Sequence, residues 1–343
     1  MGLGPGQRRG GKDRVRLRDV AERVGVSQIT VSRALRHPET VSRELRETIL
    51  RCVEEMGYIP DLSARALARG HNDVVGVLSP GLSQQVFSGA LVGIEERMRS
   101  TDFHLQYATV TFELGQELAR TQAFLAQKPA GLILAGVEHY DSLAPLLAQA
   151  TCPVAHIIDI SQEPDTLAVG IDHYAAAAEA TRYLLSRGYR RIGLIGGYPT
   201  LRTRRRMEGY EAVMSEAGLF DKALVLNRCE QSGVALGVEM LSQLVAAVPD
   251  LDAVFCQNDD VALGALFECQ RRGIRVPEDF GICGYNDLEF ASVIQPALTT
   301  VLVPRRMIGF RVADMLLRAI EGVGPPDPKI EFDFSLIRRS TTR

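Results

Sequence analysis

The chain lacks the patterns that mark membrane, exported and metal-binding proteins. No apolar run approaches the roughly 20 residues that span a bilayer, and the N-terminal residues MGLGPGQRRGGKDR lack the apolar core of a signal peptide. We therefore expect a cytoplasmic protein without membrane contact. Its cysteines form no CxxC pair, so we expect them to be reduced and to serve as small buried apolar residues. They are Cys52, Cys152, Cys229, Cys256, Cys269 and Cys283.

Sequence patterns of catalysis are missing as well. GxGxxG, P-loop and HExxH motifs are absent, the six histidines are isolated, and the glycines of GLIGG at 193–197 lack the spacing of a cofactor loop. We expect no enzyme activity, no cofactor and no metal.

The composition is that of a globular protein, with 46% apolar and 24% charged residues. The 343 residues exceed what one core usually supports, which favours two or three folded units. The net charge is −3, but residues 1–70 hold 14 Lys and Arg against 9 Asp and Glu. A basic segment joined to an acidic body indicates a module that binds a polyanion such as nucleic acid.

Three short helices are predicted within residues 15–60, the first with apolar residues at i, i+3, i+4 and i+7 and an end at Gly25. Ser27 is a suitable N-cap for the second helix, and Ser42 for the third, which ends at Gly57. The predicted inward residues are Leu17, Val20, Ala21, Val24, Val31, Ala34, Leu35, Leu45, Ile49, Cys52, Val53 and Met56.

The first two helices have helix-turn-helix spacing. The second helix leaves Gln28, Ile29, Thr30 and Arg33 facing outward, where they can reach base edges in the major groove of DNA. The alternative is an ordinary three-helix bundle with solvated outer residues. The following segment, DLSARALARG, is capped by Asp61 and ends at Gly70, so it predicts a helix of about two turns that is marginal alone.

Downstream, short apolar runs alternate with amphipathic stretches, a pattern typical of parallel sheets covered on both faces. Ligands of such sheets bind beyond the carboxyl ends of the strands. The predicted strands are 74–78, 105–109, 131–135, 153–159, 167–172, 191–197, 253–257 and 281–285.

The segments RLRDVAERVGVSQITVSRAL, VSRELRETIL and MGYIPDLSARALARG resemble the N-terminus of the lactose-repressor family of transcription regulators. The resemblance implies that Gln28 and Ile29 are the main base-reading residues, with Thr30, Ser32 and Arg33 beside them and Ser27 near a phosphate. It also implies a hinge helix that wedges Leu67 into the minor groove of double-stranded operator DNA. The alternative for Leu67 is packing on the body.

The resemblance also implies the domain organisation: an all-α helix-turn-helix domain and hinge helix, joined to a two-lobed, periplasmic-binding-protein-like α/β domain with doubly wound parallel sheets. Because no leucine heptads follow IRRSTTR, we expect a homodimer rather than a tetramer. The expected parts are a flexible basic N-terminus (1–14), the DNA-binding domain (15–60), the hinge and linker (61–71), and the effector domain (72–343), with one subdomain of 72–172 and 302–332 and another of 173–301 and 333–343.

By motif position, the effector-binding residues are expected to be Ser83, Gln85, Phe87, Asp159, Arg206, Asn258 and Asn286. Phe87 as a core residue, and Ser83 and Asp159 as helix caps, remain alternatives. Arg206 lies in LRTRRRMEGY, and a bound carboxylate would offset its charge; we expect Arg202, Arg204 and Arg205 to be solvated. Many members carry Asp at the position of Asn286, and an amide there suits an acidic ligand.

The stretches SPGLSQQVFSGALVGIE, LDAVFCQNDDVALGALFECQRRGIRVPEDFGICGY and VSRALRHPETVS are most similar to gluconate-operon repressors of this family, which are unrelated to the winged-helix family that shares their name. We therefore expect gluconate, with 2-ketogluconate and 6-phosphogluconate as alternatives, to release the protein from its operator. A free periplasmic transport-binding protein would fit the body but not the basic N-terminal module.

Overall fold

The computed structural model describes residues 15–59, 71–81, 85–110, 114–135, 140–159 and 166–343. Leu67, the rest of the expected hinge helix and Ser83 lie outside the described residues, as does the side chain of Asp159. The chain forms two compact units, Met1–Asn72 and Asp73–Arg343.

The first unit is a bundle of α1 (Leu17–Val24), α2 (Gln28–Arg36) and α3 (Arg43–Met56), with a 3-10 turn at Pro38–Thr40. Val20, Val31 and Ile49 are its fully buried core residues, one from each helix. Ser27 caps α2 because its Oγ accepts from the Thr30 N–H at 3.1 Å, whereas Ser42 precedes α3 without a side-chain cap bond. The three predicted helices are confirmed, although the expected cap of the third is not formed.

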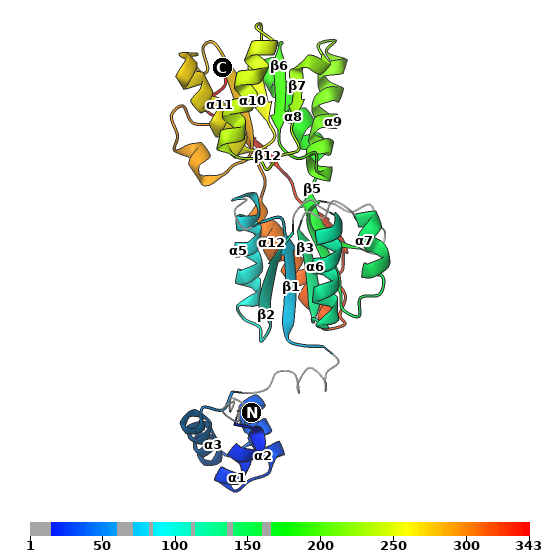
Figure 1. Cartoon of the computed structure of the whole chain (residues 1–343), viewed down its shortest axis with the longest axis vertical. Helices are drawn as coiled ribbons and strands as arrows, with labels where there is room; N and C mark the ends of the chain where they lie inside the picture. Colours follow the sequence, from blue (N-terminus) through cyan, green and yellow to red (C-terminus); the bar gives the residue numbers. More distant parts are fainter. Residues whose placement is uncertain (1–14, 60–70, 82–84, 111–113, 136–139, 160–165) are drawn as a thin grey trace, which may run out of the picture. The chain divides into compact units, whose positions relative to one another are not determined.

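The second unit has two lobes, and the first lobe is built on a parallel sheet of order β11-β5-β4-β3-β1-β2. Helices α5 and α12 pack against each other on one face, and α6 and α7 lie on the other (Figure 1). The strands are β1 (Val74–Ser79), β2 (His104–Thr109), β3 (Gly131–Ala135), β4 (Val154–Asp159), β5 (Leu167–Ile171) and β11 (Lys329–Glu331). The helices are α5 (Gln85–Met98), α6 (Leu114–Ala126), α7 (Tyr140–Leu147) and α12 (Arg305–Ile320).

The second lobe has a sheet of order β12-β10-β9-β8-β6-β7, parallel except for β12. Helix α8 packs on α9, and α10 packs on α11. The strands are β6 (Ile192–Gly196), β7 (Val225–Asn227), β8 (Ala253–Cys256), β9 (Gly281–Asn286), β10 (Thr299–Leu302) and β12 (Ser335–Ile337). The helices are α8 (His173–Ser186), α9 (Leu201–Glu216), α10 (Val234–Ala247) and α11 (Asp259–Arg272), with 3-10 turns at Lys222–Leu224 and Glu289–Ser292.

The chain passes between the two sheets after β5, after β10 and after β11. The predicted two-lobed fold with doubly wound parallel sheets is therefore confirmed. Four short strands, β7, β10, β11 and β12, were not predicted.

Two further expectations concern burial. Of the six cysteines, Cys52, Cys256, Cys269 and Cys283 are buried. Cys229 is exposed and Cys152 is only half-buried, so the expectation of burial is wrong for Cys229 and only partly met for Cys152. In the part of the chain that the structure describes, no helix has the length and apolar character needed to cross a bilayer.

Candidate functional site

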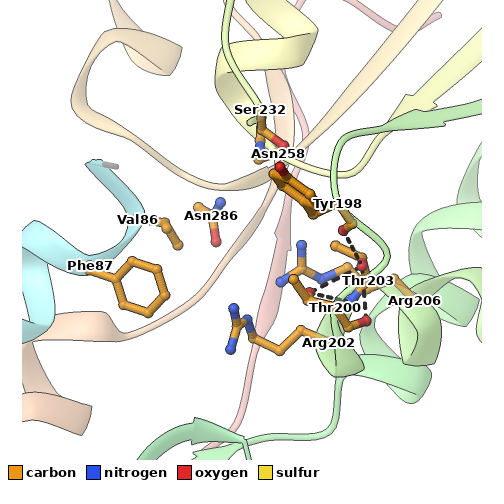
Figure 2. Close-up of a pocket in the computed structure, with 10 residues that line it drawn as sticks. All are labelled: Val86, Phe87, Tyr198, Thr200, Arg202, Thr203, Arg206, Ser232, Asn258 and Asn286. Carbon is orange, nitrogen blue, oxygen red and sulfur yellow. Dashed lines mark hydrogen bonds between the residues drawn. The ribbon is translucent and has the colours of Figure 1, made fainter. Parts of the chain in front are cut away.

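A pocket lies where α5 of the first lobe faces the ends of β6, β8 and β9 of the second lobe (Figure 2). Its empty volume, including the part open to solvent, is about 450 Å³. The lining residues are Val86, Phe87, Tyr198, Thr200, Arg202, Thr203, Arg206, Ser232, Asn258 and Asn286.

Four of the residues predicted for effector binding line this pocket: Phe87, Arg206, Asn258 and Asn286. Gln85 does not belong to the lining; its side chain is exposed, and its carbonyl accepts bonds from Ser88 Oγ at 2.6 Å and Arg305 Nη1 at 3.3 Å. The structure therefore brings together predicted residues that are up to 199 positions apart in the chain.

Arg206 is held on several sides. Only 5% of its surface is exposed, its Nη1 donates to the Gln257 carbonyl at 2.5 Å, and its guanidinium lies 3.8 Å from the centroid of the Tyr285 ring. Planar stacking of this kind fixes the direction of a guanidinium at little conformational cost. The arginine is therefore oriented before a ligand arrives.

His173, the first residue of α8, completes this arrangement. Burial, together with the charge of Arg206, holds the pKa of His173 well below its usual range, so the ring is neutral near pH 7. Because the Ile158 carbonyl can only accept, His173 Nε2 carries the proton that it donates across 3.2 Å. Nδ1 is then the acceptor for the Tyr285 hydroxyl at 2.8 Å and for Arg206 at 3.4 Å.

Arg202 contradicts the expectation of a solvated side chain. It is 7% exposed, and its guanidinium extends toward Phe87, 5.4 Å from the ring centroid (Figure 2). Arg202 and Arg206 share a face of α9 because residues four apart lie one above the other. Arg204 and Arg205 are exposed, as expected.

Amide and hydroxyl groups complete the lining. Asn258 caps α11 through Oδ1, which accepts from the Val261 N–H at 2.9 Å, and its amide nitrogen takes no part in that bond. Asn286 is 2% exposed and ends β9 with φ +114°, in the left-handed region. Together with the hydroxyls of Tyr198, Thr200, Thr203 and Ser232, these groups suit a ligand with many hydroxyls.

The chemistry of the pocket is that of binding. Two buried guanidiniums in a partly desolvated space favour an anion, most of all a planar carboxylate. Within the described ranges no group of three or more His, Cys, Asp or Glu side chains forms a metal site.

The outer face of α2 is a candidate nucleic-acid interface. Gln28, Ile29 and Arg33 are exposed, and Ile29 is 66% exposed although it is apolar. Val31 and Ala34, on the opposite face, are buried. The outer face of α2 therefore presents side chains that stay exposed within the part of the chain that the structure describes.

Comparison with known proteins finds relatives for both units of the chain. Residues 16–61 match the family of bacterial regulatory proteins, lacI family, and residues 181–342 match a periplasmic binding protein-like domain. The HTH-type transcriptional regulator GntR of Escherichia coli (strain K12) is 36% identical over 325 residues, covering 95% of this chain and 98% of that protein.

Two solved structures extend the likeness. A LacI family transcriptional regulator from Silicibacter pomeroyi is 32% identical, with a TM-score of 0.88, and the match covers 96% of this chain and 100% of that one. The Lac repressor dimer bound to operator and the anti-inducer ONPF is 26% identical, with a TM-score of 0.84, covering 96% of this chain and 99% of that one. These relatives are transcriptional regulators, not enzymes.

Proposed function

The chain belongs to the lacI family of bacterial regulatory proteins, DNA-binding transcriptional repressors, and we propose that it represses genes of gluconate uptake and catabolism. Gluconate, or a close sugar acid, binds the pocket of the second unit and releases the protein from its operator. As a regulator of chromosomal genes it works in the cytoplasm.

The observation that carries the proposal is the pair of buried arginines in a pocket otherwise lined by amides and hydroxyls. Arg202 and Arg206 supply two guanidiniums for a carboxylate. Asn286 and Asn258 can donate to or accept from the hydroxyls of an open-chain sugar acid without adding negative charge. A neutral sugar would offer the two guanidiniums no charge-assisted acceptor.

Calorimetric titration of the full chain tests the choice of ligand. Gluconate, 2-ketogluconate and 6-phosphogluconate are compared with glucitol, which replaces the carboxylate by a hydroxymethyl group. We expect at least one acid to bind about tenfold or more tightly than glucitol, the scale of a charge-assisted bond that adds about 1.4 kcal/mol or more. Equal binding of glucitol and every acid would contradict the proposal.

Arg202→Gln is the matching variant. It removes one pocket charge and keeps a polar side chain, so it should reduce the preference for the acid over glucitol while glucitol itself binds as before. Arg204→Gln, at an exposed position of the same helix, is the control and should leave both affinities unchanged.

Operator recognition is proposed for α2, with Gln28 and Ile29 at base edges, Thr30, Ser32 and Arg33 beside them, and Ser27 near a phosphate. Exposure of Gln28, Ile29 and Arg33 supports this assignment. Leu67 as the minor-groove wedge remains a prediction: Leu67→Ala should weaken specific operator binding by a few kcal/mol and leave effector affinity intact.

The family reads paired half-sites as dimers, and the relative solved with operator is a dimer. We propose that the outer face of α5 and α12 contributes to the subunit contact. Val92, Met307 and Phe310 expose large apolar side chains there, which burial against a second copy would remove from water. Met307→Glu should therefore shift the chain toward monomers in sedimentation, and an unchanged dimer would exclude this face.

A further inference from the structure

Arg305, the first residue of α12, contacts both lobes of the second unit. Its Nη1 donates to the Gln85 carbonyl at the start of α5, at 3.3 Å, and its Nη2 donates to the Asp287 carbonyl after β9, at 3.2 Å. Gln85 belongs to the first lobe and Asp287 to the second. We call these three residues the Arg305 bridge.

The charged residue of the bridge, Arg305, is half-buried. Burial lowers the pKa of Arg305, while Asp259, Asp287 and Asp260 oppose that effect, and an arginine stays protonated in this setting. Its Nε is buried and has no hydrogen-bond partner in the described structure. For a half-buried cation with one unsatisfied N–H, the two bonds to carbonyls offset part of the cost of desolvation.

The Asp287 carbonyl that Arg305 contacts belongs to the residue next to the pocket-lining Asn286. Asn286 lines the pocket, and it and Asp287 have positive φ values of 114° and 51°, which side-chain-bearing residues adopt only when the surroundings hold them. Within the second lobe, Asp259 Oδ2 accepts from the Leu288 N–H at 2.7 Å, and Arg339 donates to Asp287 Oδ1 at 2.7 Å. The turn is therefore fixed to its own lobe from two sides.

Arg305 connects this turn to the first lobe. Because the turn is rigid within the second lobe, a change in lobe separation must alter the bond between Arg305 and the Asp287 carbonyl. Hydrogen bonds weaken steeply beyond about 3.5 Å. The bond therefore favours the lobe separation seen in the structure over arrangements in which the lobes lie farther apart.

We propose that Arg305 is a positioning residue that sets the separation of the two lobes and links the turn carrying Asn286 to helix α12. The inference does not depend on which ligand occupies the pocket, because all the contacts are within the chain.

The test measures lobe separation in the full chain without effector. Spin labels are placed on the native, exposed Cys229 of the second lobe and on Arg120→Cys, an exposed position of α6 in the first lobe, in a Cys152→Ser background. Pulsed electron resonance gives the distance distribution between the labels. In Arg305→Met we expect the distance distribution to broaden about twofold or to shift, because several lobe arrangements then replace a single arrangement.

Two control variants separate positioning from mere loss of charge. Arg306→Met removes the neighbouring charge, whose Nη2 pairs with Glu96 at 2.6 Å within the first lobe, and should leave the distribution unchanged. Arg339→Met removes a hold on Asp287 from within the second lobe and should also leave it unchanged.

Arg305→Lys keeps the charge but cannot hold both carbonyls with one planar fork, so it should broaden the distribution less than Arg305→Met does. If Arg305→Met does not fold, Arg305→Lys alone decides the question. A folded Arg305 variant with the distribution of Arg306→Met would overturn the proposal. Because no effector is added, that result would leave the sugar-acid assignment untouched, and failure of gluconate to bind would leave the Arg305 bridge untouched.

Discussion

Asn286 and the two buried arginines set the charge of the pocket. Arg202 and Arg206 contribute positive charge, and Asn286 contributes a neutral amide at a position with 2% exposure. In a partly desolvated space each unit charge matters more than at the surface, because the effective dielectric constant is lower. The identity of residue 286 should therefore decide between acidic and neutral ligands.

Asn286→Asp tests this directly, since it adds a charge with almost no change in volume, and Asp tolerates positive φ nearly as well as Asn. A second anion about 4 Å from the ligand should cost on the order of 1 to 4 kcal/mol, so gluconate affinity should fall several-fold or more. Glucitol affinity should fall much less or rise. Calorimetry gives, for gluconate and for glucitol, the ratio of the variant's affinity to the parent's. Undiminished gluconate binding by the variant would refute the electrostatic argument.

Part of the pocket was predictable from sequence. The family motif predicts four of the lining residues, Phe87, Arg206, Asn258 and Asn286, whereas the sequence predicts a solvated Arg202. The helical spacing could have identified Arg202 as a lining residue, because a residue four positions before Arg206 lies on the same face of the helix. Tyr198, Thr200 and Ser232 lie in or next to loops after strands, where no periodicity indicates which side chain faces inward.

Helix caps distinguish two serines that look alike in sequence. Ser27 and Ser42 both precede a helix, but only Ser27 accepts a bond from a first-turn N–H in the structure. Loss of a real cap costs about 1 kcal/mol. Sequence alone gives the residue type at the cap position, not the side-chain rotamer that makes the bond.

Ser27→Ala should therefore raise amide exchange in the first turns of α2 by about fivefold, the equivalent of 1 kcal/mol of local opening. Ser42→Ala should leave exchange in α3 nearly unchanged. Hydrogen exchange of the full chain, read by mass spectrometry, makes the comparison, and equal effects in the two variants would contradict the assigned caps.

Close helix packing in the first lobe depends on glycine. A Cβ on Gly93 of α5 would overlap the backbone of Arg306, and one on Gly309 of α12 would overlap the backbone of Ala90. The two helices approach so closely because neither residue has a side chain at the contact.

Gly93→Ala should consequently destabilise the protein by about 1 to 3 kcal/mol, the usual cost of overpacking. Gly115→Ala, in α6, places its Cβ in open space and should leave stability unchanged or slightly higher, because alanine is the better helix former. Thermal unfolding of both variants provides the measurement. A Gly93→Ala protein as stable as the Gly115→Ala protein would show that α5 and α12 can separate freely.

Strand prediction failed for the shortest elements. β7, β11 and β12 have three residues each and β10 has four, so each holds barely one alternation of inward and outward side chains. Three of them, β7, β11 and β12, are edge strands, where burial is incomplete and the apolar signal is weak. The other eight strands agree with the sequence prediction almost to the residue, although β2 is a partly exposed edge strand and β8 has only four residues.

At the scale of the whole molecule, DNA reading and ligand binding belong to separate units, each with its own hydrophobic core. A ligand in the second unit can change operator affinity only if its own affinity differs between the free and DNA-bound states. Such coupling is reciprocal, so the proposed release by gluconate requires that the operator weaken gluconate binding by the same factor.

The most direct test of the central claim is the affinity of the full chain for its operator with and without gluconate. A duplex selected from random sequences by the protein itself, labelled for fluorescence anisotropy, removes any assumption about the operator. The account predicts that saturating gluconate weakens binding at least about fivefold, the lower range of typical allosteric coupling, while glucitol at the same concentration has no effect and Arg202→Gln responds less than the parent. Operator affinity that is the same with gluconate, with glucitol and without either would contradict it.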